Sequence, residues 1–572
     1  MAENTLNNIL NSTNYYTFLI QYFGDVKKEV AEKKPSFHIS IINNKYAMLS
    51  VPSDSFPTID TLPTFETIVY IKPPQLFTLQ EISPFKASQA EFLHLDLPLK
   101  LTGKNITIAV IDTGIDYLNE ELMDDDMNTR IEFIWDQTIA SSTPSSDIPV
   151  SFGSIYKKDS IQDAINEYRK GNDPYSIVPS KDKIGHGTKM SGIIGSSGKN
   201  PDLIGVAPDC NFIAVKLIDD YAFKSEFNIN IPAFNIAIII ATLEVLYQYA
   251  LMTNTPLIIY FPLGSNLGNH KGYDLLDQFI DNICMTSKIA LVTGAGNERV
   301  SSCHASGSIS VEQPVSIVDI DVTDDEKFLW IEIWVDLPNI ITVDVISPSG
   351  ENSGIIKSSV DSADTYSFVF EKTSIKVNYY VPEEISGDEL IRIRFYDLKP
   401  GIWKLRLTGD LILDGTYNVW IPQQGLTSYG THITPADTYG TITNPGNSKY
   451  AITAAAYNQT NNNLLNYSGC SFSNDYLNTI DIAAGGVNAL TIAPNNSIAF
   501  VNGTSVAAAI VAGACSMIFQ WGLVEGFNTN MYSQSLKTYL IRGVKTRSGD
   551  IYPNPEWGYG MLDILNIFKN IT

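Results

Sequence analysis

Three segments of the chain carry residue types that together could perform nucleophilic catalysis. Asp112 ends the apolar stretch "ITIAVID", His186 stands between two glycines in "IGHGTKMSGIIG", and Ser505 follows a turn of small residues in "FVNGTSVAAAIVAG". A serine hydroxyl becomes a nucleophile when a histidine takes its proton and an aspartate holds that histidine in the right tautomer. Asp, His, Ser is one of the chain orders in which such triads occur. The three segments therefore predict that Ser505 attacks a carbonyl, His186 passes the proton to the leaving amine, and Asp112 orients the imidazole.

Each of these residues also has a structural explanation when it is taken alone. Ser505 could be a helix N-cap, Asp112 could cap a turn or helix, and His186 could be a capping or packed histidine. All three lie at a strand end or a helix start, which favours the catalytic interpretation. The segment "VTGAGNE" ends a further strand near Asn297. Its amide could donate one hydrogen bond to an oxyanion, and the backbone N–H of Ser505 could donate another.

The elements around these residues predict a doubly wound α/β core with a parallel sheet. Continuous apolar strands, typical of sheets covered on both faces, are expected at 106–112, 211–218, 256–264 and 289–296. Helical stretches are expected between them at 229–252 and 274–287. In such folds the carboxyl ends of the strands gather the active site.

The chain on either side of this core has a different pattern. Residues 1–80 read as a small α+β unit, with strands around a helical piece at 24–33, that ends in the extended stretch "IKPPQLFTLQ". After about residue 310 the helical patterns stop, and eight short strands with turns between them predict an antiparallel β jelly roll. The predicted domains are therefore 1–80, a core split into 81–310 and 431–572, and an inserted β domain at 311–430.

Composition narrows the classes of partner. The chain has 572 residues, and its formal net charge of −24 argues against nucleic acid and anionic membranes as partners. The N-terminal stretch "MAENTLNNILNSTNYY" has neither a basic nor an apolar signal region, so synthesis in the cytoplasm without a signal peptide is expected. The apolar stretches 229–252 and 505–520 approach membrane-spanning length, but their polar interruptions favour core helices.

No cofactor is expected from the sequence. The five cysteines are scattered without a CxxC pair, which suggests neither a disulfide framework nor a zinc site. The acidic run "EELMDDDM" at 120–127 could hold Ca²⁺, but it lacks EF-hand spacing and a solvated acidic loop is favoured. Cys303 and His304 are adjacent, and a structural role is favoured over a Cys–His pair because neighbouring strand residues point to opposite faces.

Taken together, the motifs resemble those of the subtilase family of serine proteases. "DTG" follows the family's pattern around the acid, "GHGT" around the base, "GTSVAA" around the nucleophile and "GAGN" around the oxyanion asparagine, and "APDCNFIAVKLID" and "WGYGMLD" resemble the family's core. The resemblance covers about 81–310 and 430–572. It implies a serine endopeptidase with Asp112, His186 and Ser505 as catalytic residues and Asn297 in the oxyanion hole. Ala509 stands where most subtilases have proline, and little loss of activity is expected from this departure.

Within the family, the chain most resembles the clostridial germination-type Csp proteases. That resemblance implies an N-terminal prodomain that stays in the cleft as a partner, a jelly-roll insertion, and association with spores. It also implies a protein substrate, for which the proform of a spore cortex hydrolase is the candidate. Two alternatives remain open: a general intracellular subtilase for peptide turnover, and a catalytically silent germinant sensor or scaffold, since some members of the group lack triad residues.

The resemblance also suggests where the chain cuts itself. A subtilase prodomain feeds its C-terminal tail into the cleft, so cleavage is expected between Gln80 and Glu81 in "FTLQEIS", although a plain linker would explain the segment as well. An extended peptide would pair with strands on either side of it. The residues expected to bind it are Leu263, Gly264, Ser265, Gly294, Ala295 and Gly296.

Overall fold

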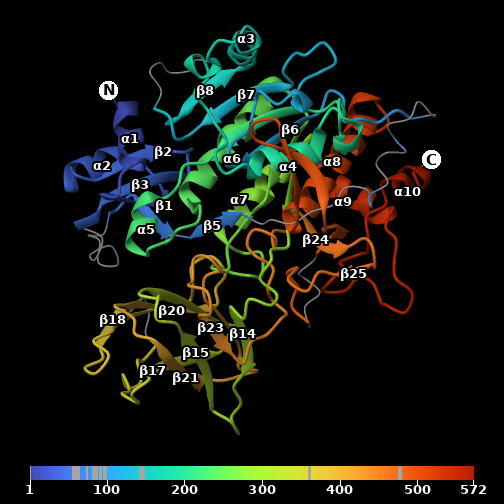
Figure 1. The fold of residues 1–572 in the computed structure, drawn as a ribbon. Coiled ribbons are helices and arrows are strands. Elements are labelled where there is room, and N and C mark those ends of the chain that lie inside the picture. The colour runs from blue at the N-terminus through green and yellow to red at the C-terminus, as the bar shows by residue number, and fades with distance from the viewer. Residues whose placement is uncertain are drawn as a thin grey trace.

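The computed structural model of the chain describes residues 2–54, 65–72, 75–79, 88, 93, 99–140, 148–358, 363–473 and 480–571. Figure 1 shows an α/β core with a smaller N-terminal unit, in blue, on one side and an antiparallel β unit, in yellow-green and orange, below it. Both termini of the chain lie on the core side of the molecule, away from the β unit. The predicted Gln80 and Glu81 lie outside the described residues.

The core is built on a mostly parallel sheet with the strand order β25-β24-β13-β11-β6-β9-β7-β8, and β26 pairs with β24. Antiparallel pairing occurs at β8 and β25 only, among the described pairs of this sheet. The doubly wound core expected from the sequence is confirmed. The strands of the sheet are β6 (Thr107–Asp112), β7 (Ile131–Asp136), β8 (Ser154–Lys157), β9 (Asn211–Lys216), β11 (Leu257–Phe261), β13 (Ile289–Gly294), β24 (Ile452–Asn458), β25 (Asn463–Leu464) and β26 (Ile482–Gly485).

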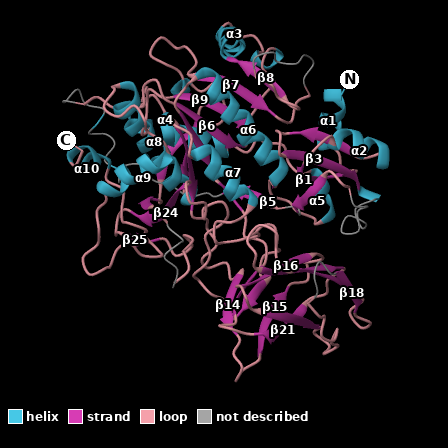
Figure 2. Cartoon of the chain, turned by 180° about the vertical axis from the view of Figure 1, so that it is seen from behind, coloured by secondary structure: helices cyan, strands magenta, loops and turns pink. Residues whose placement is uncertain are grey.

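Each central strand is apolar on both faces because helices cover both sides of the sheet. On β6, Ile108 and Val110 pack into one hydrophobic cluster, whereas Ala109 and Ile111 pack into another. The first cluster contains residues of α4 (His186–Gly195), α8 (Thr504–Phe519), α9 (Ser533–Arg542), α10 (Ile564–Lys569) and α3 (Lys158–Arg169). The second contains residues of α6 (Ile236–Thr253) and α7 (Leu275–Cys284). The helices on both sides of the sheet are visible from behind in Figure 2.

The helix expected at 229–252 begins later, at Ile236, because the side chain of Asn235 accepts a hydrogen bond from the backbone N–H of Ala237 as an N-cap. Before this cap, the short strand β10 (Phe234–Asn235) follows α5 (Tyr221–Glu226). Two helices of the described chain, Ile236–Thr253 and Thr504–Val524, are long and apolar enough to cross a membrane. The buried share is 56% for the first and 94% for an 18-residue stretch of the second. That burial is what core helices show.

The N-terminal unit is a four-stranded antiparallel sheet that rests on the core. Its order is β2-β3-β1-β4, formed by β1 (Tyr15–Tyr22), β2 (His38–Ile41), β3 (Tyr46–Pro52) and β4 (Ile68–Lys72), with the helices α1 (Ala2–Leu10) and α2 (Val26–Lys33). Leu19, Tyr46 and Met48 belong to the same hydrophobic cluster as α6 and α7, and the rings of Tyr46 and Phe279 meet edge to face. The unit therefore shares an apolar core with the rest of the protein.

After this unit the chain enters the core as β5 (Leu76–Leu79), which joins a different sheet. It lies between β10 and β12 (Leu263–Gly264) in a three-stranded antiparallel arrangement, with Leu79 opposite Leu263 and Thr78 opposite Gly264. In Figure 1, β5 runs below the core helices, on the side that faces the β unit.

The β unit is a sandwich of a six-stranded and a four-stranded antiparallel sheet that share one hydrophobic cluster. It runs from His304 to Thr434, beyond the predicted 311–430, because its outer strands β14 and β23 have too few apolar residues to be recognised. The strands are β14 (His304–Ser308), β22 (Thr416–Trp420), β16 (Leu329–Val335), β20 (Glu389–Tyr396), β19 (Ser374–Tyr380) and β18 (Ala363–Ser367) in one sheet, and β17 (Ile340–Ile346), β21 (Gly401–Leu411), β15 (Val315–Val322) and β23 (His432–Thr434) in the other. A separate hairpin of β27 (Ala489–Ala493) and β28 (Ser497–Val501) precedes α8.

Candidate active site

Asp112 and His186 meet at the carboxyl edge of the central sheet. Asp112 is the last residue of β6, and His186 is the first residue of α4. Both side chains are fully buried, and Nδ1 of His186 lies 2.7 Å from Oδ2 of Asp112. The other carboxylate oxygen accepts a 2.7 Å hydrogen bond from the backbone N–H of Thr113. Nδ1 is therefore the ring nitrogen of His186 that faces Asp112.

The loop that carries His186 is held by a second buried carboxylate, Asp182. Its Oδ1 accepts hydrogen bonds from the hydroxyl of Thr113 at 2.8 Å and the N–H of Gly185 at 2.7 Å. Its Oδ2 accepts from the N–H and the hydroxyl of Thr188 at 2.9 and 2.7 Å. Asp182 thus ties the residue after Asp112 to both sides of His186. Sequence reasoning missed it, although an acidic residue shortly before a buried helix start was a visible signal.

Ser505 lies in the first turn of α8, but it is not the residue that caps the helix. The N-cap position is Gly503, with φ of 139°, and no side-chain cap hydrogen bond is present. Ser505 is fully buried, and its Oγ has no hydrogen-bond partner among the described residues. A buried hydroxyl that satisfies no backbone group needs an explanation of another kind. The capping interpretation of Ser505 is therefore not supported.

A tyrosine of the central sheet binds the backbone of Ser505. The hydroxyl of Tyr260, on β11, donates a buried 2.7 Å hydrogen bond to the backbone carbonyl of Ser505. Burial raises the pKa of the Tyr260 phenol well above its usual range, and the negative charge of Asp112 raises it further. Tyr260 therefore stays a hydrogen-bond donor at neutral pH. Nothing in the sequence distinguished it from the other apolar residues of its strand.

Asn297 lies against the start of the helix that carries Ser505. Its side-chain oxygen accepts hydrogen bonds from the backbone N–H and the hydroxyl of Thr504, at 3.4 and 3.3 Å. With the oxygen engaged in this way, the amide N–H₂ is the end of the Asn297 side chain left to face another acceptor. The structure thus has an amide donor beside the start of the helix that carries Ser505, as an oxyanion hole would require.

The residues expected to bind a peptide have different environments. Leu263 and Gly264 form β12 and pair with β5. Ser265 instead exchanges two backbone hydrogen bonds with Asn444, at 3.1 and 2.9 Å. Gly294 ends β13, and the carbonyls of the next two residues, Ala295 and Gly296, accept hydrogen bonds from other loops of the core. Of these six residues, only Leu263 and Gly264 are paired with β5 in the described structure, whereas Gly294 is paired with Ala454 of β24.

Neither a metal cluster nor a Cys–His pair is formed by the described residues. They contain no group of three or more His, Cys, Asp or Glu that could hold a metal ion. The Cys303 thiol donates to the carbonyl of Ser301, whereas the ring of His304 stacks on Trp420 with 4.6 Å between ring centroids. In the acidic run, the carboxylate of Glu121 accepts hydrogen bonds from backbone N–H groups at 198–200, so this residue organises a loop.

Comparisons with known proteins agree with these features. The Subtilase family pattern matches residues 103–353 and 435–560, on both sides of most of the sandwich. Among solved structures, the CspB protease of Clostridium perfringens is 29% identical to this chain with a TM-score of 0.74, and the match covers 84% of this chain and 96% of that one. The epidermin leader peptide processing serine protease EpiP of Staphylococcus aureus is 14% identical with a TM-score of 0.47, over 98% of this chain and 99% of that one.

None of the curated proteins matches the chain. The family pattern nevertheless spans well over half of the sequence and contains the segments of Asp112, His186, Asn297 and Ser505. The resemblance expected from the motifs is confirmed: this chain belongs to the subtilase family and is a serine endopeptidase.

Proposed function

We propose that Asp112, His186 and Ser505 form the catalytic triad of this endopeptidase. Ser505 Oγ attacks the carbonyl carbon of the scissile peptide, and His186 takes its proton and passes it to the leaving amine. Asp112 holds the imidazole through the 2.7 Å contact and stabilises its charged form. The N–H₂ of Asn297 and the backbone N–H of Ser505 stabilise the oxyanion.

We also propose that residues 1–80 form a prodomain that is cut after Gln80 and then stays in the cleft as an inhibitor. The observation that carries this proposal is the position of β5 as the middle strand between β10 and β12. An extended substrate binds a protease by strand addition of this kind. Leu79 is paired with Leu263, so the next two residues of the chain, Gln80 and Glu81, are the ones that follow the paired strand.

The finer biological role is proposed from the likeness to the Clostridium perfringens CspB protease. We propose limited proteolysis of a protein substrate, the proform of a spore cortex hydrolase, during germination. The protease would be made in the cytoplasm and act in association with the spore, with no nucleic acid or membrane as partner. The inserted sandwich is proposed to be a jelly roll that orients the core and restricts which substrates enter. A general intracellular protease for peptide turnover is the alternative within the same class.

One observation favours a second candidate function. The strand-pairing positions beside the site are taken by the chain's own β5, which shares a buried core with the N-terminal unit. A chain held permanently in this state would act as a silent sensor or scaffold, with its triad intact.

The intact masses of the wild-type chain and Ser505→Ala separate these candidates. An active triad yields a fragment of the first 80 residues from the wild type, and the Ser505→Ala chain stays whole. If both chains stay whole and a fluorophosphonate probe does not label Ser505, the proposed enzyme activity is refuted and the silent candidate holds. A cut at another position would correct Gln80 alone.

A further inference from the structure

The strand β5 is in contact with the inserted sandwich as well as with the core. Gln75, Leu76 and Phe77 are each at most 2% exposed. The ring of Phe77 meets Phe261 of the core edge to face, with 6.0 Å between the centroids. Leu76, the residue before Phe77, has contacts that the core alone does not supply.

The contribution of the sandwich begins with Gln423, three residues after the end of β22. Its side chain is 1% exposed, and its Nε2 donates hydrogen bonds to the carbonyls of Leu76 and Gly264, at 3.3 and 2.8 Å. Its Oε1 accepts a 3.2 Å hydrogen bond from the backbone N–H of Asn266. One side chain of the inserted segment therefore joins β5 to its neighbouring strand β12.

The side chain of Leu76 also contacts the inserted sandwich. Leu76 belongs to a hydrophobic cluster that includes Leu426 and Trp330 of the inserted segment and Phe223 of α5. Leu76, Phe223 and Trp330 line the same cavity, which lies between the core and the sandwich. An apolar residue at this position of the strand is thus enclosed from two sides.

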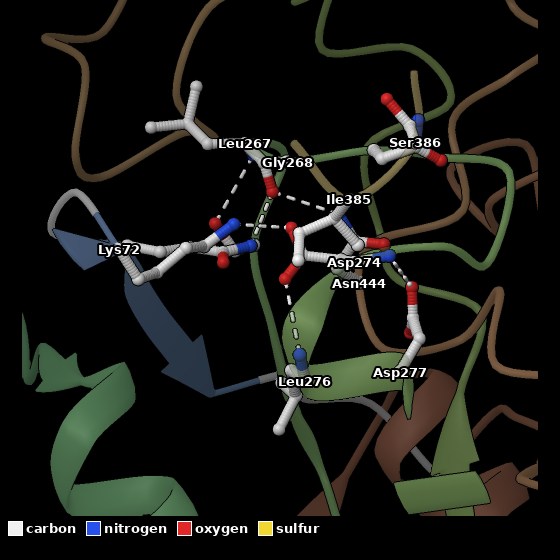
Figure 3. Close-up of polar contacts among 12 residues, drawn as sticks. Lys72, Leu267, Gly268, Asp274, Leu276, Asp277, Ile385, Ser386 and Asn444 are labelled. Carbon is white, nitrogen blue, oxygen red and sulfur yellow. Dashed lines mark hydrogen bonds and ion pairs between the residues drawn. The ribbon is translucent and has the colours of Figure 1, made fainter. Parts of the chain in front are cut away.

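Polar groups fix the position of the sandwich relative to the cleft. Gly268, in the loop after β12, donates its backbone N–H to the buried carboxylate of Glu332 at 2.9 Å. Glu332 is paired in turn with the buried guanidinium of Arg392, 2.8 Å away. Figure 3 shows the neighbouring contacts, in which Lys72 of the N-terminal unit pairs with Asp274 of the core at 2.5 Å. The side of the sandwich that carries Gln423 and Trp330 is therefore held against the core by a buried, charged group.

Upstream of Leu76, Gln75 is bound by the core on both its backbone and its side chain. Its carbonyl accepts a 3.2 Å hydrogen bond from the N–H of Ile236, and its side-chain amide donates to the carbonyl of Leu267. The core thus contacts β5 and also Gln75, the residue before it.

We propose that the inserted sandwich forms one wall of an extended substrate site, which reads the fifth and sixth residues counted back from the cut. The substrate class is a protein segment that is extended over at least six residues and has a large apolar side chain at the fifth. This inference rests on the proposed function, because it takes β5 as the stand-in for a substrate and Gln80 as the residue before the cut. Short peptides that lack these upstream residues would be poor substrates, since they supply neither the carbonyl that Gln423 binds nor the apolar side chain beside Trp330.

The experiment follows self-cleavage of the full chain after synchronised synthesis in a cell-free system. The measured quantity is the first-order rate constant, because misfolded chains lower the amount cleaved and leave that constant unchanged. The variants are Leu76→Ala, Trp330→Ala and their combination, together with Gln423→Leu and its neighbour Gln424→Leu as the matched control. Gln424 is exposed, so its replacement keeps the wild-type rate.

Leu76→Ala is expected to slow cleavage about ten-fold in the wild-type background and only about two-fold in the Trp330→Ala background, because a coupled pair of residues is not additive. Gln423→Leu is expected to slow it about ten-fold, since two buried carbonyls lose a donor. If Gln423→Leu cleaves at the wild-type rate and Leu76→Ala has the same effect in both backgrounds, the inference is overturned while the proposed function stands. A wild-type chain that never cleaves and does not react with a fluorophosphonate probe overturns both.

Discussion

The substitution Asp182→Asn tests whether the His186 loop is held by charge. The carboxylate of Asp182 accepts four hydrogen bonds, two on each oxygen, from Thr113, Gly185 and Thr188. An asparagine keeps the size of the side chain but turns one acceptor oxygen into a donor N–H₂. The hydroxyl and the backbone N–H that donated to that oxygen then face the new N–H₂ group, so one backbone N–H loses its buried acceptor.

The expected cost follows from these contacts. An unsatisfied buried N–H costs about 1–3 kcal/mol, and the remaining hydrogen bonds lose the extra strength that an ionised acceptor provides. We expect the free energy of unfolding to fall by about 3 kcal/mol on this account. Because His186 follows Gly185 directly, its ring should also shift, and a displacement of about 1 Å in a catalytic group lowers the rate on the order of 100-fold.

The assay measures the rate constant of self-cleavage by intact mass and the unfolding midpoint in denaturant. Asp173→Asn is the matched control, because Asp173 is exposed and its side chain accepts a hydrogen bond from the backbone N–H of Tyr175 in a surface turn. That variant should differ little from the wild type in either measurement. Wild-type cleavage and wild-type stability in Asp182→Asn would refute the argument that this carboxylate positions His186.

Three further outcomes are expected. Tyr260→Phe removes the 2.7 Å hydrogen bond to the Ser505 carbonyl and should lower the self-cleavage rate constant about ten-fold, with a stability loss of only about 1 kcal/mol; an unchanged rate would exclude a positioning role. Burial raises the pKa of the Glu389 carboxyl to about 7 in the folded chain. The stability that the fold has with this carboxyl protonated is therefore fully present below about pH 4 and is lost as the pH rises to about 7, because the unfolded chain ionises first. The free energy of unfolding of Glu389→Gln, measured relative to the wild type, should therefore rise by up to about 3 kcal/mol between pH 4 and pH 8. A difference that does not change with pH would contradict this. All five cysteines are buried and free, and burial raises the pKa of each thiol, so iodoacetamide should add mass only after denaturation; labelling of the native chain would show that the interior opens.

Much of the core could be predicted because its signals are local. A strand covered on both faces must be apolar at every position, which is why β6, β9, β11 and β13 could be recognised from their residues alone. The missed elements lack such a signal. The helix α3 is amphipathic and polar, β14 consists of small and polar residues, and β23 has only three residues.

The same distinction holds within the site. The types and order of Asp112, His186 and Ser505 were sufficient to predict a triad, because only a few residue types can serve as acid, base and nucleophile. The surrounding residues are ordinary ones. Tyr260 reads as one more apolar strand residue and Gln423 as a loop residue, and their roles exist only through contacts across long intervals of sequence.

The family, the strands of the core and the candidate triad could thus be predicted from residue types and short-range patterns. Which atoms meet became visible only in the folded chain. Folding placed β5 between β10 and β12, and it brought the inserted sandwich against the cleft through Gln423. Strand pairing and buried hydrogen bonds join groups that are distant along the chain, and no local pattern of residues specifies which distant partner each group will find.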